Sequence, residues 1–223
     1  MHLVIISGAT RAKNKSNTAK IIEAFRKGYE AEGNTTEVWY LSERSQWKMA
    51  KEAFHKHDHI LFALPLYVEN IPGSMLEFLE TLEKKEETGT QIAFLLQGGF
   101  PEASQLRCCE MYLEKLPAML GCEYAGTLLK GDMFGLGFVD EKQRAKALQP
   151  FEEMGRRFAK THCFDKEEVS QFAEPEFFSK VTLRAFQCIG RHIQRMFMSK
   201  MAKSLGCKQK LDVRPYDNVQ YNK

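Results

Sequence analysis

Apolar runs of strand length alternate with segments of helical periodicity over about the first 160 residues of the chain. The predicted strands are nearly continuous apolar stretches at residues 3–7, 35–41, 59–64, 91–96 and 124–129. Such stretches are typical of strands buried on both faces, whereas a half-exposed strand alternates apolar and polar residues. The pattern therefore predicts a parallel sheet that is covered on both sides.

Between and after these strands, apolar residues recur every three or four positions, which predicts five helices. The first starts at Thr18 and stops at Gly33, and the others cover residues 45–56, 75–82, about 102–120 and about 141–160. Because each predicted strand is followed by a helix, right-handed crossovers connect parallel neighbours. We predict an α/β fold with a doubly wound five-stranded parallel sheet, in a domain that spans residues 1–162.

The last segment, residues 163–223, is not needed for these five units and is predicted to be a basic amphipathic helical extension. Pro175 starts a predicted long helix whose apolar positions are Phe178, Val181, Ala185, Ile189, Ile193, Phe197 and Met201. From residue 175 onward, ten Lys or Arg stand against three acidic residues, so the chain's net charge of +3 comes from this segment. Packing on the parent domain or on a second subunit is favoured over contact with an anionic membrane. Covering the ligand crevice is a third alternative.

Composition and charge exclude several functional classes. The small net charge and the lack of an aromatic and basic RNA-binding signature argue against a nucleic-acid partner. The six cysteines form no CxxC pair, so no zinc or iron–sulfur site is predicted from them, and scattered thiols suit a reducing compartment. No stretch approaches the roughly 18 apolar residues of a transmembrane helix. We expect a soluble cytoplasmic protein.

Three histidines, His55, His57 and His59, stand at alternate positions near the end of a predicted helix. Side chains with this spacing diverge around a helix end, and no partner cluster is visible in the sequence. They are interpreted as solvated polar residues, and no metal site is predicted.

A doubly wound sheet binds ligands beyond the carboxyl ends of its strands, so the loops that follow strands carry the candidate chemistry. The first loop, from Gly8 to Thr18, reads GATRAKNKSNT and ends at a helix N-terminus, where free amides and hydroxyls favour an anion. It lacks the GxxxxGK[ST] pattern of nucleotide-triphosphate sites and the GxGxxG pattern of dinucleotide sites. Simple N-capping by Ser16 or Asn17 is the alternative.

Two further loops suit a planar ring. In ALPLYVENIPG, residues 63–73, Pro65 lacks an N–H and is expected to end the strand, and Tyr67 offers a flat face. In LLQGGFPEA, residues 95–103, Gly98 and Gly99 permit close approach of a flat ligand and can aim amides at its polar edge. Each loop alone has an ordinary explanation, as a surface aromatic or a tight turn. Together with the first loop, they predict a site for a phosphate and a planar ring.

These loops resemble the motifs of a known family. The stretch ISGATRAKNKSNTAKIIEAF resembles the GSPR…GNTAK phosphate loop of flavodoxin-like NAD(P)H-dependent FMN reductases, and PLYVENIPGSMLEFLE is similar to their PlY…PG segment. QGGF falls where the third flavin loop of that family lies. Ala9 and Thr10 depart from the family's Ser and Pro, so the corresponding hydroxyl is expected from Ser7, Thr10 or Ser16. The resemblance covers about residues 1–160.

The resemblance implies FMN as the cofactor and NADH or NADPH as its transient electron donor. The residues expected to bind the cofactor are Ser7, Thr10, Arg11, Ser16, Asn17, Thr18, Pro65, Leu66, Tyr67, Val68, Gln97, Gly98 and Gly99. Arg11 and residues 16–18 would hold the phosphate, residues 65–68 would border the ring, and the two glycine amides would meet its pyrimidine edge. A flavin carries the redox chemistry itself, so no catalytic acid, base or nucleophile is expected from the protein.

The function implied by the resemblance is electron transfer from a nicotinamide through bound flavin to a small oxidised acceptor, such as a quinone, nitro, azo or flavin compound. A homodimer is expected, because such crevices are often completed across an interface. A flavodoxin-type electron carrier that serves a protein partner, and a scaffold that has lost its cofactor, are the alternatives. The mildly basic charge and the long extension favour the enzyme, since short flavodoxins are usually acidic.

Overall fold

The structure is a computed structural model that describes residues 1–86, 89–185 and 190–214. The chain forms two compact units, Met1–Phe177 and Phe178–Lys223. The sequence predicts a boundary after residue 162, whereas the contacts in the structure group residues 163–177 with the sheet. Each unit is therefore described by itself.

The first unit is built on one five-stranded sheet in the order β2-β1-β3-β4-β5, and each pair of neighbours is parallel. The strands are β1 (His2–Ser7), β2 (Thr35–Tyr40), β3 (His59–Pro65), β4 (Gln91–Gln97) and β5 (Glu123–Lys130). This arrangement confirms the predicted doubly wound five-stranded parallel sheet. The strand order reverses between β1 and β3, where such folds form a crevice.

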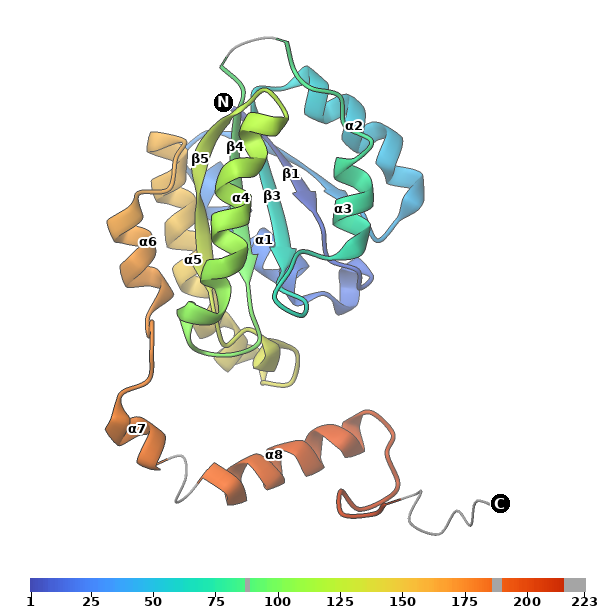
Figure 1. Cartoon of the computed structure of the whole chain (residues 1–223), viewed down its shortest axis with the longest axis vertical. Coiled ribbons are helices and arrows are strands. Elements are labelled where there is room, and N and C mark those ends of the chain that lie inside the picture. Colours follow the sequence, from blue (N-terminus) through green and yellow to red (C-terminus); the bar gives the residue numbers. More distant parts are fainter. Residues whose placement is uncertain (87–88, 186–189, 215–223) are drawn as a thin grey trace. The chain divides into compact units, whose positions relative to one another are not determined.

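Helices cover both faces of this sheet, with α1 and α5 on one face and α2, α3 and α4 on the other (Figure 1). The α-helices are α1 (Asn17–Ala31), α2 (Trp47–Lys56), α3 (Gly73–Leu79), α4 (Arg107–Met119), α5 (Glu141–Thr161) and α6 (Lys166–Ala173). Short 3-10 helices are η1 (Lys13–Lys15), η2 (Arg44–Gln46), η3 (Ala103–Leu106) and η4 (Phe134–Gly137). The predicted helices thus lie within a few residues of their expected positions.

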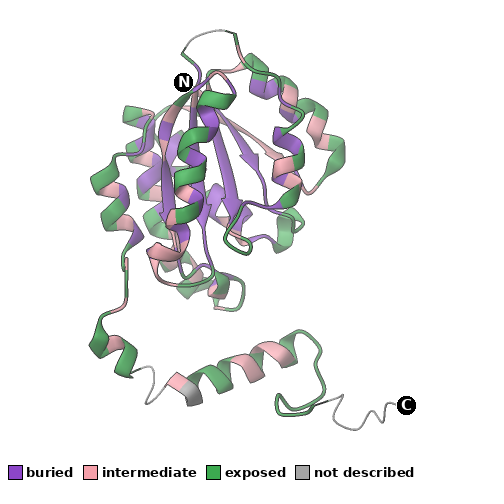
Figure 2. Cartoon of the chain, viewed as in Figure 1, coloured by how far each residue is buried: buried purple, intermediate pink, exposed green. Residues whose placement is uncertain are grey.

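Strands β1, β3 and β4 form the centre of the core and bury every residue after their first (Figure 2). Their continuous apolar runs match this two-sided burial, as expected for a parallel sheet between helical layers. The edge strand β2 is different: all its residues except Tyr40 are partly or fully accessible. Its lower burial explains the more polar sequence TTEVWY.

The proline at the end of β3 corrects one expectation. Pro65 was predicted to lie beyond the strand, but it belongs to β3 and pairs with Gln97 of β4. The N–H of Leu66 bonds the carbonyl of Gln97 at 2.8 Å, so the N–H that Pro65 lacks would point to the other side, toward β1. The β1–β3 ladder ends at Ser7 and Ala63, and no ladder bond is lost there.

Residues 163–177 are anchored to the sheet by burial and by hydrogen bonds. Phe164, Val169 and Ala173 are buried, and the Phe164 N–H bonds a carbonyl of β5 at 2.9 Å. Farther along, Arg107 of α4 donates to the Glu176 carboxylate from Nη2 at 2.7 Å. These contacts explain why the unit ends after Phe177.

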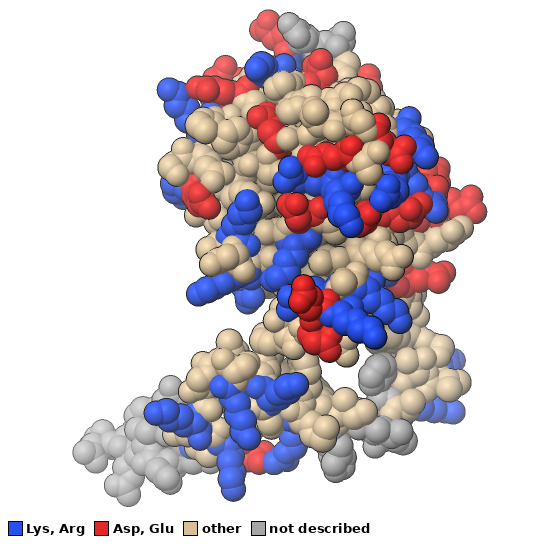
Figure 3. All heavy atoms as spheres, turned by 180° about the vertical axis from the view of Figure 1, so that it is seen from behind, with Lys and Arg blue, Asp and Glu red and all other residues tan. Residues whose placement is uncertain are grey.

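The second unit contains α7 (Lys180–Ala185) and α8 (Arg191–Ser204). The helix predicted to begin at Pro175 begins instead at Lys180. Pro175 belongs to the first unit, where its carbonyl accepts a hydrogen bond from the Ala103 N–H at 2.9 Å. Residues 186–189, with the predicted apolar position Ile189, lie outside the described residues. Lys and Arg gather on this unit with few acidic side chains among them (Figure 3). Arg195 and Asp212 form one ion pair there.

None of the described helices is long and apolar enough to span a membrane.

Two glycines allow α1 and α5 to touch backbone to backbone. A Cβ on Gly28 would lie 1.8 Å from the carbonyl oxygen of Glu152, and one on Gly155 would lie 2.1 Å from that of Phe25. Both obstacles are backbone atoms of a neighbouring helix, so neither can rotate away. The close crossing of these helices therefore depends on the missing side chains.

We predict that Gly28→Ala lowers the free energy of unfolding by about 2–3 kcal/mol, because the added methyl group forces the two helices apart. Urea denaturation measures the change. Gly73→Ala is the matched control: Gly73 begins α3 with open space around its Cα, so a change of less than about 0.5 kcal/mol is expected. Equal effects of the two substitutions would contradict the helix-crossing explanation.

We also predict that a chain ending after Phe177 keeps the free energy of unfolding of the sheet unit. A chain ending after residue 162 should lose about 3–5 kcal/mol of it, measured by urea denaturation. The shorter chain exposes the surface that Phe164 and Val169 cover, and each such side chain contributes about 1.5–3 kcal/mol. Equal midpoints for the two truncations would place the boundary after residue 162.

Candidate functional site

The loops that follow β1, β3, β4 and β5 meet at the carboxyl edge of the sheet and enclose a cavity of about 410 Å³. This volume lies within the roughly 300–1,000 Å³ of small-molecule sites. The lining residues are Ala9, Arg11, Ser16, Asn17, Thr18, Pro65, Leu66, Tyr67, Val68, Glu69, Gln97, Gly99, Phe100, Gln105, Met133 and Phe134. All three loops singled out in the sequence contribute to this one cavity.

The start of α1 lies in the cavity wall and has free donors. Ser16 is the N-cap, and its Oγ accepts a hydrogen bond from the Ala19 N–H at 3.2 Å. The amides of Asn17 and Thr18 are the first two of the helix and have no preceding helical carbonyl to bond. Capping and anion binding, the two alternatives left by the sequence, are therefore compatible: the side chain of Ser16 caps, and the next amides remain available.

The side chains at the start of α1 also tie the loops together. The Asn17 Nδ2 donates to the Met133 carbonyl, 2.9 Å away in the loop after β5. The Gln97 Nε2, at the end of β4, donates to the buried Thr18 Oγ1 at 3.3 Å. These bonds fix the helix N-terminus relative to two other strands, which gives a preorganised wall.

Positive charge gathers beside this helix terminus. Burial lowers the pKa of the Lys20 ammonium, and the nearby charges of Arg144 and Arg11 lower it further. Arg144 donates to the carbonyls of Leu136 and Val139 at 3.2 and 3.0 Å. No acidic side chain in the described part of the chain pairs with Arg11, Lys20 or Arg144. Three uncompensated cations at a helix N-terminus favour a bound anion.

Aromatic side chains provide the apolar part of the wall. Tyr67, Phe100 and Phe134 line the cavity, and all three are exposed, Phe100 to 71%. Exposed aromatic groups around a cavity mark a binding site more often than a plain surface. The Tyr67 hydroxyl lies 3.5 Å from the Thr10 Oγ1, which links the first two loops.

The tip of the second loop has a strained backbone. Val68 and Glu69 have φ values of 50° and 63°, and the flanking Tyr67 and Asn70 exchange hydrogen bonds of 2.8 and 3.1 Å. A β-branched residue such as valine rarely adopts a positive φ, and this conformation costs about 1–3 kcal/mol. Val68 is also 96% exposed, so the tip is held in this shape although its side chain contacts little protein.

Three of the residues predicted to bind the cofactor do not line the cavity: Ser7, Thr10 and Gly98. Ser7 is fully buried, and Thr10 reaches the wall only through Tyr67. The Gly98 amide donates to the carbonyl of Lys130 at 2.9 Å, so it cannot point at a ligand as expected. A Cβ on Gly98 would lie 2.9 Å from Leu106 Cδ2, so side-chain packing explains this glycine.

The sequence analysis missed several wall residues: Glu69, Phe100, Gln105, Met133 and Phe134. The last two belong to the glycine-rich segment KGDMFGLGF that follows β5. The sequence could have predicted that this segment contributes to the site, because the carboxyl ends of all parallel strands meet at one edge of the sheet. Asn17, by bonding Met133, brings this fourth loop into the site.

A second and more open depression of about 1,280 Å³ runs along the exposed sides of α1 and α5. Half of its lining residues are Lys or Glu, among them Lys20, and Lys27 forms an ion pair with Glu152 at 2.9 Å. Lys13, one of the cations of the first loop, lines this depression and lies over the Tyr40 ring at 5.0 Å. Its charged residues of both signs do not favour one kind of ligand.

Comparisons with solved structures agree with this fold. An NAD(P)H:quinone oxidoreductase from Methanothermobacter marburgensis superposes with a TM-score of 0.56 at 17% identity, over 71% of this chain and 96% of that chain. An NADH:FMN oxidoreductase in its apo form superposes with a TM-score of 0.54 at 18% identity, over 78% of this chain and 96% of that chain. An FMN-dependent NADH-azoreductase from Bacillus anthracis, in complex with FMN, gives 0.52 at 16% identity, over 71% and 100%. No curated protein sequence matches the chain.

The family profile described as NADPH-dependent FMN reductase matches residues 1–123. The match includes three of the four loops that line the cavity and covers more than half of the chain. It confirms the family suspected from the loop motifs. This chain belongs to the NADPH-dependent FMN reductase family.

Proposed function

We propose that the cavity at the carboxyl edge of the sheet binds FMN and that the protein transfers electrons from NADH or NADPH to a small oxidised acceptor. Quinone, nitro, azo and flavin compounds are the proposed acceptor classes. The observation that carries the proposal is that one cavity is lined by a helix N-terminus, by Arg11 and by exposed aromatic side chains. FMN has one phosphate and one planar ring, so the residues present fit it.

In this proposal the protein holds the phosphate at the start of α1. The amides of Asn17 and Thr18 donate to it, and the guanidinium of Arg11 neutralises part of its charge. Lys20 and Arg144 add positive potential without an acidic partner among the described residues. The Ser16 hydroxyl acts indirectly, because it caps the helix and keeps these amides in place.

The rest of the cavity borders the ring. Residues 65–68 and the exposed Phe100 and Phe134 provide apolar surface, and the Gly99 amide replaces the Gly98 amide as the proposed donor to the polar edge. Bound FMN would supply the redox centre, which accepts two electrons from the nicotinamide and passes them on. The protein's role is to bind and orient the cofactor and to leave one side of its ring accessible. The exposure of Val68 and Phe100 is consistent with such access.

A homodimer in the cytoplasm remains our proposal for the assembly and location of the protein. The described cysteines are all free thiols, which suits a reducing compartment. The exposed apolar residues Ile193 and Met196 of α8 favour burial of that helix on protein, with membrane contact the less favoured alternative.

We predict that NADH or NADPH, mixed anaerobically with the FMN-loaded protein in a stopped-flow instrument, bleaches the absorption of the oxidised flavin. Steady-state rates with a quinone acceptor should follow ping-pong kinetics, because donor and acceptor use the same accessible side of the site in turn. A protein that retains FMN but shows no bleaching with either nicotinamide would instead be an electron carrier.

We predict that Arg11→Gln weakens FMN binding about tenfold or more, since a charge-assisted hydrogen bond contributes about 1.5–3 kcal/mol. Flavin fluorescence quenching in titrations of the apoprotein measures the affinity. Riboflavin, which lacks the phosphate, should bind both proteins equally. Lys27→Gln is the control, because this cation lies on α1, away from the cavity, and pairs with Glu152. Equal losses of affinity for FMN and riboflavin would show that Arg11 does not contact the phosphate.

A further inference from the structure

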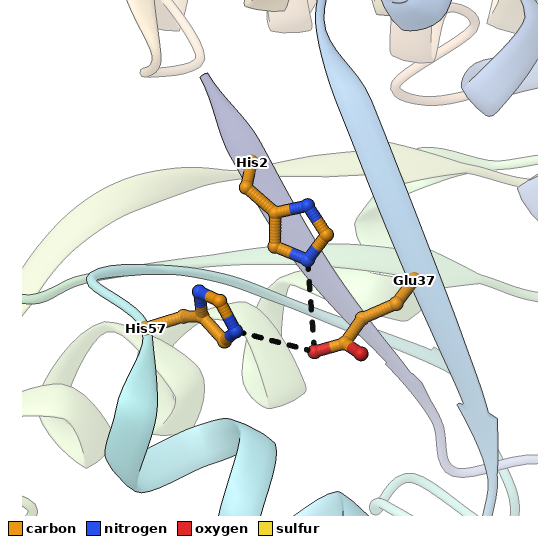
Figure 4. A group of neighbouring side chains, drawn as sticks. All are labelled: His2, Glu37 and His57. Carbon is orange, nitrogen blue, oxygen red and sulfur yellow. Dashed lines mark ion pairs between the residues drawn. The ribbon is translucent and has the colours of Figure 1, made fainter.

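Two imidazoles and one carboxylate converge at the opposite end of the sheet from the cavity. His2 begins β1, Glu37 lies in β2, and His57 directly follows α2 (Figure 4). The Nε2 atoms of His2 and His57 lie 3.6 and 3.7 Å from the same atom, the Glu37 Oε1. These separations are ion-pair distances when the imidazoles are protonated, and they are too long for hydrogen bonds.

The shared carboxylate oxygen has no other partner. Glu37 Oε1 is buried from solvent and accepts no hydrogen bond from the residues described by the structure. A buried carboxylate oxygen is rarely left unsatisfied, because desolvation of the charge is costly. An electropositive centre between Oε1 and the two Nε2 atoms would satisfy it.

The orientation of His2 suits a metal as this centre. Its Nδ1 lies 2.9 Å from the Thr35 Oγ1, and that hydroxyl donates to the Met1 carbonyl at 3.4 Å. The Thr35 oxygen is then an acceptor for the Nδ1–H, so in the neutral ring the lone pair is on Nε2, the nitrogen that faces Glu37. An outer hydrogen bond of this kind fixes the tautomer and ring orientation of a metal-bound histidine.

The backbone of His57 is fixed as well. Its N–H bonds the Ala53 carbonyl at 3.2 Å, and its carbonyl accepts from the Lys85 Nζ at 2.7 Å. His2 and Glu37 side chains lie on one face of the sheet, because Thr35 is opposite His2 and Glu37 is opposite Val4. Two strands and a helix end thus present three donors toward one point.

The spacing suits a small divalent ion. Zinc binds histidine nitrogen and carboxylate oxygen at about 2.0–2.2 Å, which places tetrahedral ligands about 3.4 Å apart. The two measured separations exceed this by only a few tenths of an ångström, and all three donor atoms lie within 4.8 Å of one another. The side chains are 24–34% exposed, so water can reach the fourth position.

We propose that His2, Glu37 and His57 form a binding site for a zinc-type divalent transition-metal ion. Two histidines, one glutamate and a water are a donor set that Zn²⁺ uses in open sites. The site lies at the start of β1, roughly 16 Å of strand away from the proposed flavin cavity. A metal ion bound there would link β1, β2 and the α2–β3 connection. Metal binding can be measured without any assay of electron transfer.

The test is Zn²⁺ binding to the full-length flavoprotein after EDTA treatment and dialysis. Calorimetry and metal analysis should give one Zn²⁺ per chain, and the thermal midpoint should rise with added Zn²⁺. Glu37→Gln and His57→Asn should each weaken binding about 100-fold or more, since even an outer-shell partner contributes about 10–100-fold. His55→Asn is the matched control, because this exposed histidine lies on α2 two residues before His57 and is not one of the three clustered side chains.

Three results would overturn the proposal: no Zn²⁺ retained by the unmodified protein, equal binding by Glu37→Gln, His57→Asn and wild type, or loss of binding after alkylation of the cysteines. The last result would assign the ion to thiols such as the exposed Cys108 and Cys163. The urea midpoint in EDTA checks that each variant is folded. If one is not, His2→Asn replaces it, because His2 is the partly exposed first residue of its strand.

Discussion

The parallel arrangement of the five strands is the constraint on which the other features of the sheet unit depend. Each strand has to return through a helix on one face, so every loop that follows a strand lies at the same edge. At that edge α1 starts beside the ends of β3, β4 and β5, and its free amides face a cavity. The His2–Glu37–His57 cluster lies at the other edge, where strands begin. One topology thus separates the proposed flavin site from the proposed metal site.

Apolar or β-branched and aromatic runs predicted all five strands, and the runs are continuously apolar in β1, β3 and β4, which are buried on both faces. The loop motifs predicted most of the cavity wall for a related reason: the start of α1, Tyr67 and Gly99 directly follow those strands. The prediction failed where a residue's role depends on a distant partner. Gly98 looks like a flexible turn residue, but its amide belongs to the ladder with β5 and its Cα packs on Leu106.

The same limit explains the metal cluster and the domain boundary. His57 was interpreted as a solvated residue because its neighbours in sequence, His55 and His59, diverge from it. Its partners, His2 and Glu37, come from two strands, and only the register of β1 and β2 brings them together. Likewise, residues 163–177 follow the fifth unit in sequence, yet tertiary burial of Phe164 joins them to β5. Contacts of this kind, between residues distant in the sequence, leave no local pattern in the sequence.

The backbone contacts at Gly28 and Gly155, where α1 crosses α5, act as a fixed pivot for α1. Asn17 lies 11 residues before Gly28, which is about 16 Å along the helix, so a tilt of about 5° at the pivot moves the first amides by about 1.4 Å. A displacement of about that size in a group that contacts a ligand can strongly reduce binding or catalysis. A side chain inserted at the pivot would therefore misplace the phosphate donors even in molecules that remain folded. The geometry of the proposed flavin site depends on two residues that do not line its cavity.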